Sequence, residues 1–209
     1  MNEPSPSPLV SFIGRVHGKA VFGRRVQVLA REIARLLPAG RLADVGCGSG
    51  SIAEAVRAAR PDVSPEGFDV LVRPGASIPV RAFDGRRLPL ADGSVAAALL
   101  VDVLHHAGDP AALLAECARV APVVVVKDHL ASSRRDERLL ACMDWVGNRP
   151  HGVVLPFSYF SPESWEEARR RAGLVETARG DVTDLYPWPF SLAFGGGLHF
   201  LARLEKATS

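Results

Sequence analysis

Three glycines alternate with small residues directly after an apolar run, in the order Asp44, Val45, Gly46, Cys47, Gly48, Ser49, Gly50. An apolar run, a glycine-rich turn and a helical pattern together predict a strand, a tight turn and the start of a helix. Amides that open a helix are unpaired and lie at the positive end of its dipole, so they favour anionic or polar ligand groups. Glycine lets a ligand approach this backbone closely. The segment therefore indicates a binding site, and a glycine-rich turn without a function is the alternative.

The spacing of the glycines bears on which ligand binds. A dinucleotide site usually has the pattern Gly-x-Gly-x-x-Gly. Here the pattern is Gly-x-Gly-x-Gly, and Ser51 stands where the last glycine of a dinucleotide site would fall. This favours a nucleoside ligand that has no pyrophosphate.

An acid at the end of the next strand also fits a nucleoside. The second strand is expected to end near residues 68–70, at a distance of about twenty residues from the glycines, where an acid can grip the ribose hydroxyls. We assign this role to Asp69 and place Val70 against the adenine face. Glu66 takes the role if the strand end is shifted, and an acid in a solvated loop is the alternative.

Two polar clusters follow the predicted fourth and fifth strands. They are Asp102 with His105 and His106, and Lys127 with Asp128 and His129. Because the carboxyl ends of parallel strands face the ligand crevice, both clusters should lie beside the glycine turn. A neutral imidazole near pH 7 can act as a general base. The candidates, in order of preference, are His106, His129, His105 and His151, although a single histidine is more often structural. Asp128 either orients His129 or caps a helix.

The glycine turn resembles motif I of class I S-adenosylmethionine (SAM) methyltransferases, which reads Asp-x-Gly-x-Gly-x-Gly after a strand. The string Val-Leu-His-His-x-x-Asp-Pro, which begins at Val103, resembles the type 11 branch of these enzymes, including those of ubiquinone and menaquinone biosynthesis. The resemblance implies SAM as cofactor and S-adenosyl-L-homocysteine as product, and it implies that Asp84 accepts a hydrogen bond from the adenine amino group. The cofactor-binding set that we expect is Asp44, Gly46, Cys47, Gly48, Gly50, Asp69, Val70, Asp84, Gly85 and Asp102.

The elements that must position these residues predict an α/β protein. Asp109 followed by Pro110 is a start signal for one helix. The resemblance implies a single domain with a seven-stranded, Rossmann-like, doubly wound sheet whose last strand is antiparallel. Strands are expected at residues 41–45, near 68–70, around 80–84, and at 95–104, 122–126, 174–177 and 198–204. Helices are expected at 26–37, 51–59, 111–120, 134–146 and after Ser161.

The chain is expected to divide into a disordered tail at residues 1–8, an N-terminal helical lid at 9–40 and a SAM-binding domain at 41–209. Within that domain, residues 130–165 form an insertion after the fifth strand that covers the substrate. A packing helix is the alternative for the lid, and a structural lobe or dimer contact is the alternative for the insertion. The candidate acceptor-binding residues are Trp145, Asn148, His151 and Tyr159.

The composition argues against several classes of protein. A net charge of +2 over 209 residues gives no reason to expect nucleic acid or a membrane surface as partner. The three cysteines form no Cys-x-x-Cys pair, so we expect neither a disulfide framework nor a metal site. No signal peptide or membrane-length apolar run is evident, which favours the cytoplasm. No Asp/Asn-Pro-Pro-Tyr/Phe string follows the fourth strand, which favours a small-molecule acceptor, bound by a monomer or homodimer.

The hypothesis that follows is a SAM-dependent methyltransferase acting on an O, N or C atom of a secondary metabolite, quinone-like compound or lipid precursor. A nicotinamide-dependent oxidoreductase is one alternative. Ser51 and the lack of a Tyr-x-x-x-Lys pair count against it. A SAM-binding protein that transfers no methyl group is the other alternative, because cofactor and acceptor residues are separate.

Overall fold

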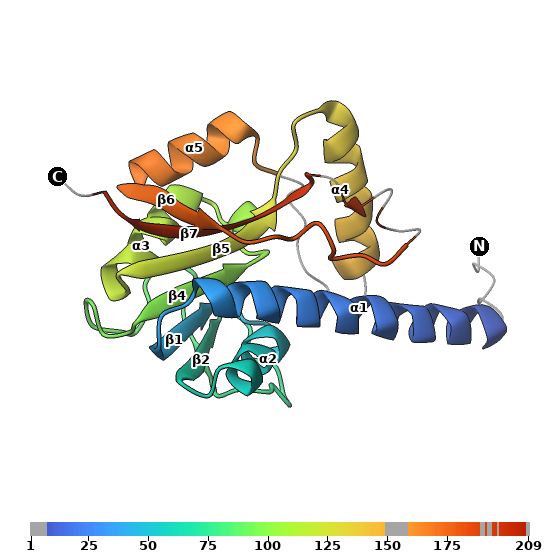
Figure 1. Ribbon diagram of the computed structural model, residues 1–209, viewed down its shortest axis with the longest axis horizontal. Coiled ribbons are helices and arrows are strands. Elements are labelled where there is room, and N and C mark those ends of the chain that lie inside the picture. Colours follow the sequence, from blue (N-terminus) through green and yellow to red (C-terminus); the bar gives the residue numbers. More distant parts are fainter. Residues whose placement is uncertain (1–7, 149–158, 189–190, 192–193, 196, 208–209) are drawn as a thin grey trace.

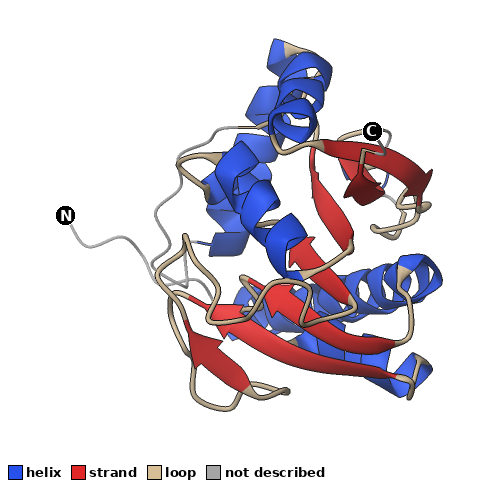
Figure 2. Ribbon diagram, turned by 90° about the vertical axis from the view of Figure 1, so that its left-hand side faces the viewer, coloured by secondary structure: helices blue, strands red, loops and turns tan. Residues whose placement is uncertain are grey.

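The computed structural model describes residues 8–148, 159–188, 191, 194–195 and 197–207. A seven-stranded sheet in the order β3-β2-β1-β4-β5-β7-β6 forms its centre (Figure 2). The strands are β1 (Gly40–Val45), β2 (Val63–Asp69), β3 (Val80–Ala82), β4 (Ala97–Val101), β5 (Val123–His129), β6 (Leu174–Arg179) and β7 (His199–Lys206). β1 to β5 pair in parallel, whereas β7 is antiparallel to both of its neighbours. The predicted doubly wound sheet with an antiparallel last strand is confirmed.

Helices cover both faces of the sheet (Figure 1). They are α1 (Pro8–Leu36), α2 (Ser51–Ala59), α3 (Pro110–Val120), α4 (Arg134–Asn148) and α5 (Pro162–Arg171), with a 3-10 turn at Leu104–His106. α1 and α2 pack on one face, and α3 and α5 pack on the other. Successive residues of β4 alternate between the two cores, with Ala97 and Leu99 in one and Ala98 and Leu100 in the other. Burial on both faces explains why this strand is a continuous apolar run.

α1 is longer than the helix predicted over residues 26–37. It begins at Pro8, and proline is well tolerated in the first turn of a helix, where its missing N–H would be unpaired in any case. The C-terminal part of α1 is anchored by Leu29 and Ile33, both of which are fully buried. Figure 1 shows the N-terminal part continuing past the edge of the sheet. The role of residues 9–40 as a lid stays a prediction.

Local capping fixes the helices that adjoin the site. The side chain of Asp109 accepts hydrogen bonds from the backbone N–H groups of Ala111 and Ala112, at 3.1 and 3.2 Å, as its position before Pro110 predicts. Ser161 forms a capping box with Ser164 at the start of α5. These caps hold α3 and α5 in place beside the carboxyl end of the sheet.

Candidate active site

The glycine turn after β1 has a backbone conformation that favours glycine at three positions. Gly46, Gly48 and Gly50 all have positive φ angles, of 70°, 56° and 71°. A Cβ atom on Gly46 would lie 2.5 Å from Cγ2 of Val103, so this glycine allows the turn to pack against the end of β4. A Cβ atom on Gly48 would meet nothing within 4 Å. Gly48 is therefore required by its backbone conformation and borders open space.

Asp69 reaches the glycine turn from the end of β2. Its Oδ2 accepts a hydrogen bond from the Gly48 N–H at 2.8 Å, and its Oδ1 accepts one from the Leu71 N–H at 2.9 Å. The two elements that we expected to hold a nucleoside thus lie side by side. The reserve candidate, Glu66, instead pairs with Arg41 and Arg81.

The loops after β2 and β3 are also adjacent. Val70 is 67% exposed, and its Cγ1 would lie 3.3 Å from a Cβ atom on Gly85. Asp84 is exposed, and its Oδ1 accepts hydrogen bonds from the backbone N–H groups of Arg86 and Arg87, each at 2.8 Å. These bonds hold the pKa of Asp84 below its usual value. Val70, Asp84 and Gly85 are therefore close together, beside Asp69.

Two ionisable groups beside the glycines have pKa values that are raised above their usual range. Burial, together with the neighbouring carboxylate of Asp69, raises the pKa of Asp44 to about 7. Burial and the carboxylates of Asp44 and Asp69 raise the pKa of the Cys47 thiol to about 12. Since the thiolate is the reactive form of cysteine, Cys47 is suited to packing and not to nucleophilic chemistry.

A buried ion cluster lies at the end of β4. Asp102 has a φ of 55° and is the one non-glycine residue with positive φ in the described part of the chain. Its carboxylate pairs with Lys127 at the end of β5 and with Arg25 of α1. Burial opposes ionisation of Asp102, but Lys127 and Arg25 outweigh it and hold its pKa well below the usual value. Lys127 is fully buried, and burial lowers its pKa although Asp102 acts in the opposite direction.

The histidines form a second, connected group. Nδ1 of His105 lies 2.6 Å from Oδ1 of Asp128, whose Oδ2 accepts a hydrogen bond from the backbone N–H of Leu104 at 3.0 Å. Asp128 therefore fixes the ring of His105. The same carboxylate accepts the backbone N–H groups that open the 3-10 turn, which is a capping role as the sequence suggested, and it accepts the backbone N–H of His129 at 2.7 Å. The ring of the half-buried His106 packs against that of His105, with their centroids 3.9 Å apart.

His129 is more enclosed than His106. Its Nδ1 lies 3.1 Å from Nδ1 of His199, and its Nε2 lies 3.6 Å from Oδ1 of Asp102. Burial and the ammonium group of Lys127 lower the pKa of His129 well below its usual value. His129 is neutral at pH 7 for this reason, but it is only 5% exposed.

The predicted acceptor residues are less fully placed. The ring of Tyr159 lies 6.0 Å from the rings of both His105 and His129. Trp145 and Asn148 lie near the C-terminal end of α4, and His151 lies outside the described residues. The acceptor-binding role of all four stays a prediction. Across the part of the chain that the structure describes, no group of three or more His, Cys, Asp or Glu side chains could hold a metal ion.

Sequence reasoning missed two members of the site. His199 opens β7 directly opposite His129, and the antiparallel pairing of the last strand could have revealed it. Arg25 reaches Asp102 across 77 positions of the sequence. No motif marks Arg25, and only the direction of its side chain on α1 brings it to the site.

Several solved structures have a fold similar to that of this chain. A methyltransferase in complex with the Haloferax volcanii Trm112 methyltransferase activator has a TM-score of 0.67 and 16% identity, with 98% of this chain and 100% of that chain covered. A SAM-dependent methyltransferase from Thermotoga maritima, described as a possible histamine N-methyltransferase, has a TM-score of 0.63 and 20% identity, covering 95% and 97%. The [4+2]-cyclase SpnF has a TM-score of 0.59 and 18% identity, covering 89% and 81%. A search of curated proteins found no match.

The fold and the glycine turn define the class I SAM-dependent methyltransferases. A family model described as a methyltransferase domain matches residues 21–178, and the chain belongs to that family. It is a SAM-dependent methyltransferase with SAM as its cofactor. The nicotinamide alternative is thereby set aside. Among the described helices, none is both long and apolar enough to cross a membrane.

Proposed function

We propose that the chain transfers the methyl group of SAM to an oxygen, nitrogen or carbon atom of a small molecule, such as a secondary metabolite or a quinone-like or lipid precursor. One observation supports this most: the glycine turn, Asp69 and the polar residues after β4 and β5 lie at one edge of the sheet. SAM supplies a methyl group that is already activated by its sulfonium. The protein mainly has to align the acceptor and exclude water. Action in the cytoplasm, as a monomer or homodimer, belongs to the same proposal.

The residues around the glycine turn suit the parts of the cofactor. Each carboxylate oxygen of Asp69 accepts one backbone N–H and retains a further lone pair, so Asp69 would hold the ribose hydroxyls. Val70 and Gly85 would lie against the adenine, and Asp84 would accept from its amino group. Asp44 would face the positively charged end of the cofactor. Its carboxyl group lies beside the turn, its pKa is raised to about 7, and a nearby cation would favour its ionised form.

We assign the general base to His106. A base is needed when the acceptor is a hydroxyl or an acidic carbon, and His106 is half-buried, which leaves it more accessible than His105 or His129. Asp128 holds His105, and the ring of His105 packs against that of His106. In this arrangement His105 and Asp128 are positioning residues, which set the orientation of the base.

Calorimetry with a matched pair of glycine variants tests the cofactor site. Gly48→Val should abolish SAM binding, since the side chain would occupy the open space beside the turn. Gly93 has a similar φ, of 60°, and an equally open surrounding, but it precedes β4 at the opposite end of the sheet. Gly93→Val therefore imposes the same backbone strain and should leave SAM binding intact. SAM binding that survives Gly48→Val would contradict the site.

A second candidate function is that of a SAM-binding protein that transfers no methyl group and serves a different reaction. The similarity of the fold to the [4+2]-cyclase SpnF favours this candidate, because that neighbour is named for a cyclisation. Incubation with methyl-labelled SAM and a panel of phenols, quinols and amines separates the two functions. A labelled product supports methyl transfer, and SAM binding without any labelled product supports the second candidate.

A further inference from the structure

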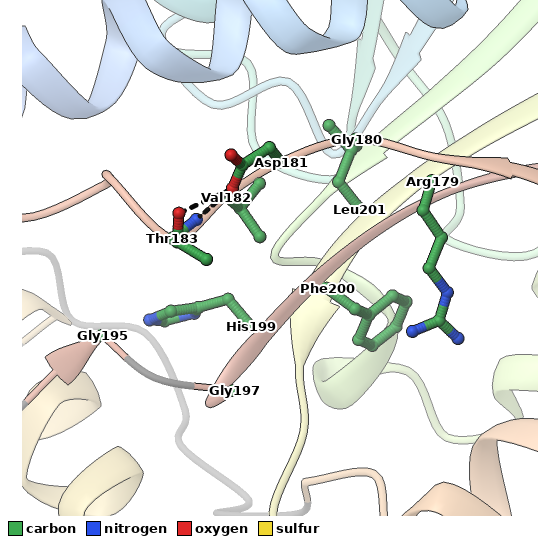
Figure 3. A pocket seen from close by; sticks show the side chains of 10 residues that line it. All are labelled: Arg179, Gly180, Asp181, Val182, Thr183, Gly195, Gly197, His199, Phe200 and Leu201. Atoms are coloured by element: carbon green, nitrogen blue, oxygen red, sulfur yellow. Dashed lines mark hydrogen bonds between the residues drawn. The ribbon is translucent and has the colours of Figure 1, made fainter.

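A cavity of about 160 Å³ lies where β6 ends and β7 begins. Its walls include Gly180, Asp181, Val182, Thr183, His199 and Leu201. Figure 3 shows the ring of His199 on one side and the side chain of Thr183 facing it from the loop that follows β6. Gly180 keeps this loop close to β7, because a Cβ atom on it would overlap the side chain of Leu201. The cavity lies outside the insertion at residues 130–165, where the sequence predicted the acceptor.

The size of the cavity limits what can enter it. An apolar protein cavity of about 150 Å³ holds one benzene molecule. A cavity of about 160 Å³ therefore has room for a single six-membered ring. Val182 and Leu201 supply apolar surface, and both are buried.

The hydrogen bonds around the cavity define which ring substituent fits. The Thr183 hydroxyl donates to Oδ1 of Asp181 at 2.7 Å, so its oxygen can act only as an acceptor toward a ligand. A hydroxyl or amino group on the ring supplies the matching donor. Nε2 of His199 donates to the carbonyl of Phe194 at 3.1 Å, which leaves Nδ1 to accept from Nζ of Lys127 at 3.3 Å. Both ring nitrogens are thus engaged, and His199 serves as a planar wall.

The cavity is connected to the cofactor turn by a short series of contacts. Lys127 joins His199 to Asp102, and Val103, the residue after Asp102, packs against Gly46. A group held beside His199 is therefore near the end of β4, where the cofactor crevice begins. We propose that this cavity is a subsite for one end of the acceptor and that it selects acceptors with a six-membered ring bearing a hydroxyl or amino group, with Thr183 as the hydrogen-bond acceptor of that group and the atom that is methylated outside the cavity. This inference rests on the proposed methyltransferase function.

Phenol binding to the chain saturated with S-adenosyl-L-homocysteine tests the proposal, with ligand-observed NMR as the readout. Phenol should bind in the millimolar range, which a ligand this small can reach. Val182→Phe fills the cavity and should weaken phenol binding at least about tenfold, the effect of losing roughly 1.4 kcal/mol of contact. Val175→Phe, on the exposed side of β6, is the matched control and should change nothing.

Thr183→Val keeps the test decisive if Val182→Phe fails to fold. It removes the acceptor oxygen at constant shape, so phenol should bind about fivefold more weakly, the value of one net hydrogen bond, while toluene is unaffected. Equal binding of phenol to the native chain and to the folded variants would overturn the proposal. Calorimetry with SAM distinguishes a failure of the proposed function from a failure of the acceptor subsite. Absence of SAM binding refutes the proposed function, whereas SAM binding without phenol binding refutes the acceptor subsite alone.

Discussion

Asp102→Asn tests whether the buried ion cluster is held together as its geometry indicates. Asparagine has nearly the same shape and also tolerates the positive φ of this position, so the change removes a charge and little else. Lys127 is fully buried and would then lose its carboxylate partner. Removing one member of a buried pair generally costs about 3–5 kcal/mol, because the other charge is left unpaired.

The ordinary pKa of lysine sets an upper limit on the stability that Asp102→Asn can lose. Lys127 can escape its unpaired charge by losing a proton, which at pH 7 costs about 4.6 kcal/mol for a lysine whose ordinary pKa is about 10.4. In the unfolded variant Lys127 keeps its proton up to about pH 10.4, so above pH 7 the unfolded variant binds more protons than the folded variant. The free energy of unfolding of Asp102→Asn should therefore rise with pH above 7, by up to about 1.4 kcal/mol per pH unit relative to the native chain.

Urea unfolding followed by tryptophan fluorescence at pH 7 and pH 9.5, without SAM, measures both effects. Adding Lys127→Met to Asp102→Asn should recover most of the loss, since the unpaired charge is then gone. Asp92→Asn is the matched control, because Asp92 pairs with Arg119 at the surface, where its side chain is 80% exposed, and should cost less than about 1 kcal/mol. A loss below about 1 kcal/mol for Asp102→Asn, or no recovery in the double variant, would refute the reasoning.

Two further predictions concern proton equilibria. The affinity for SAM, which is cationic, should rise with pH up to about 7 and then level off, because the Asp44 carboxyl group gains its negative charge over that range. Asp44→Asn should flatten this profile in calorimetry, and an unchanged profile would exclude Asp44 as the source. Once an acceptor with a hydroxyl group is found, His106→Gln should lower kcat by roughly a hundredfold or more while the KM for SAM stays the same. A normal kcat with His106→Gln would remove His106 as the base.

The sequence was most informative where a structure depends on neighbouring residues. The glycine turn, the Asp109 cap and the bounds of α2 follow from local conformational preferences, and each lies where predicted. The sheet topology followed from the family resemblance. The partners of charged side chains did not follow from either source. Asp128 is next to His129 in the sequence, yet its carboxylate contacts the ring of His105, and this contact depends on how the 3-10 turn after β4 packs against β5.

Two energetically unfavourable features of the described structure coincide at the end of β4. A non-glycine residue with positive φ and a fully buried lysine are each unfavourable, by about 1–3 kcal/mol for the backbone and more for an unpaired charge. Both occur in the Asp102–Lys127 pair, between the glycine turn and the cavity beside His199. Neither feature is needed to close a doubly wound sheet, which apolar residues at these positions would also permit. Their joint occurrence at the edge where cofactor and acceptor would meet is expected if the pair serves to fix the site, since local rules are most often broken at functional positions.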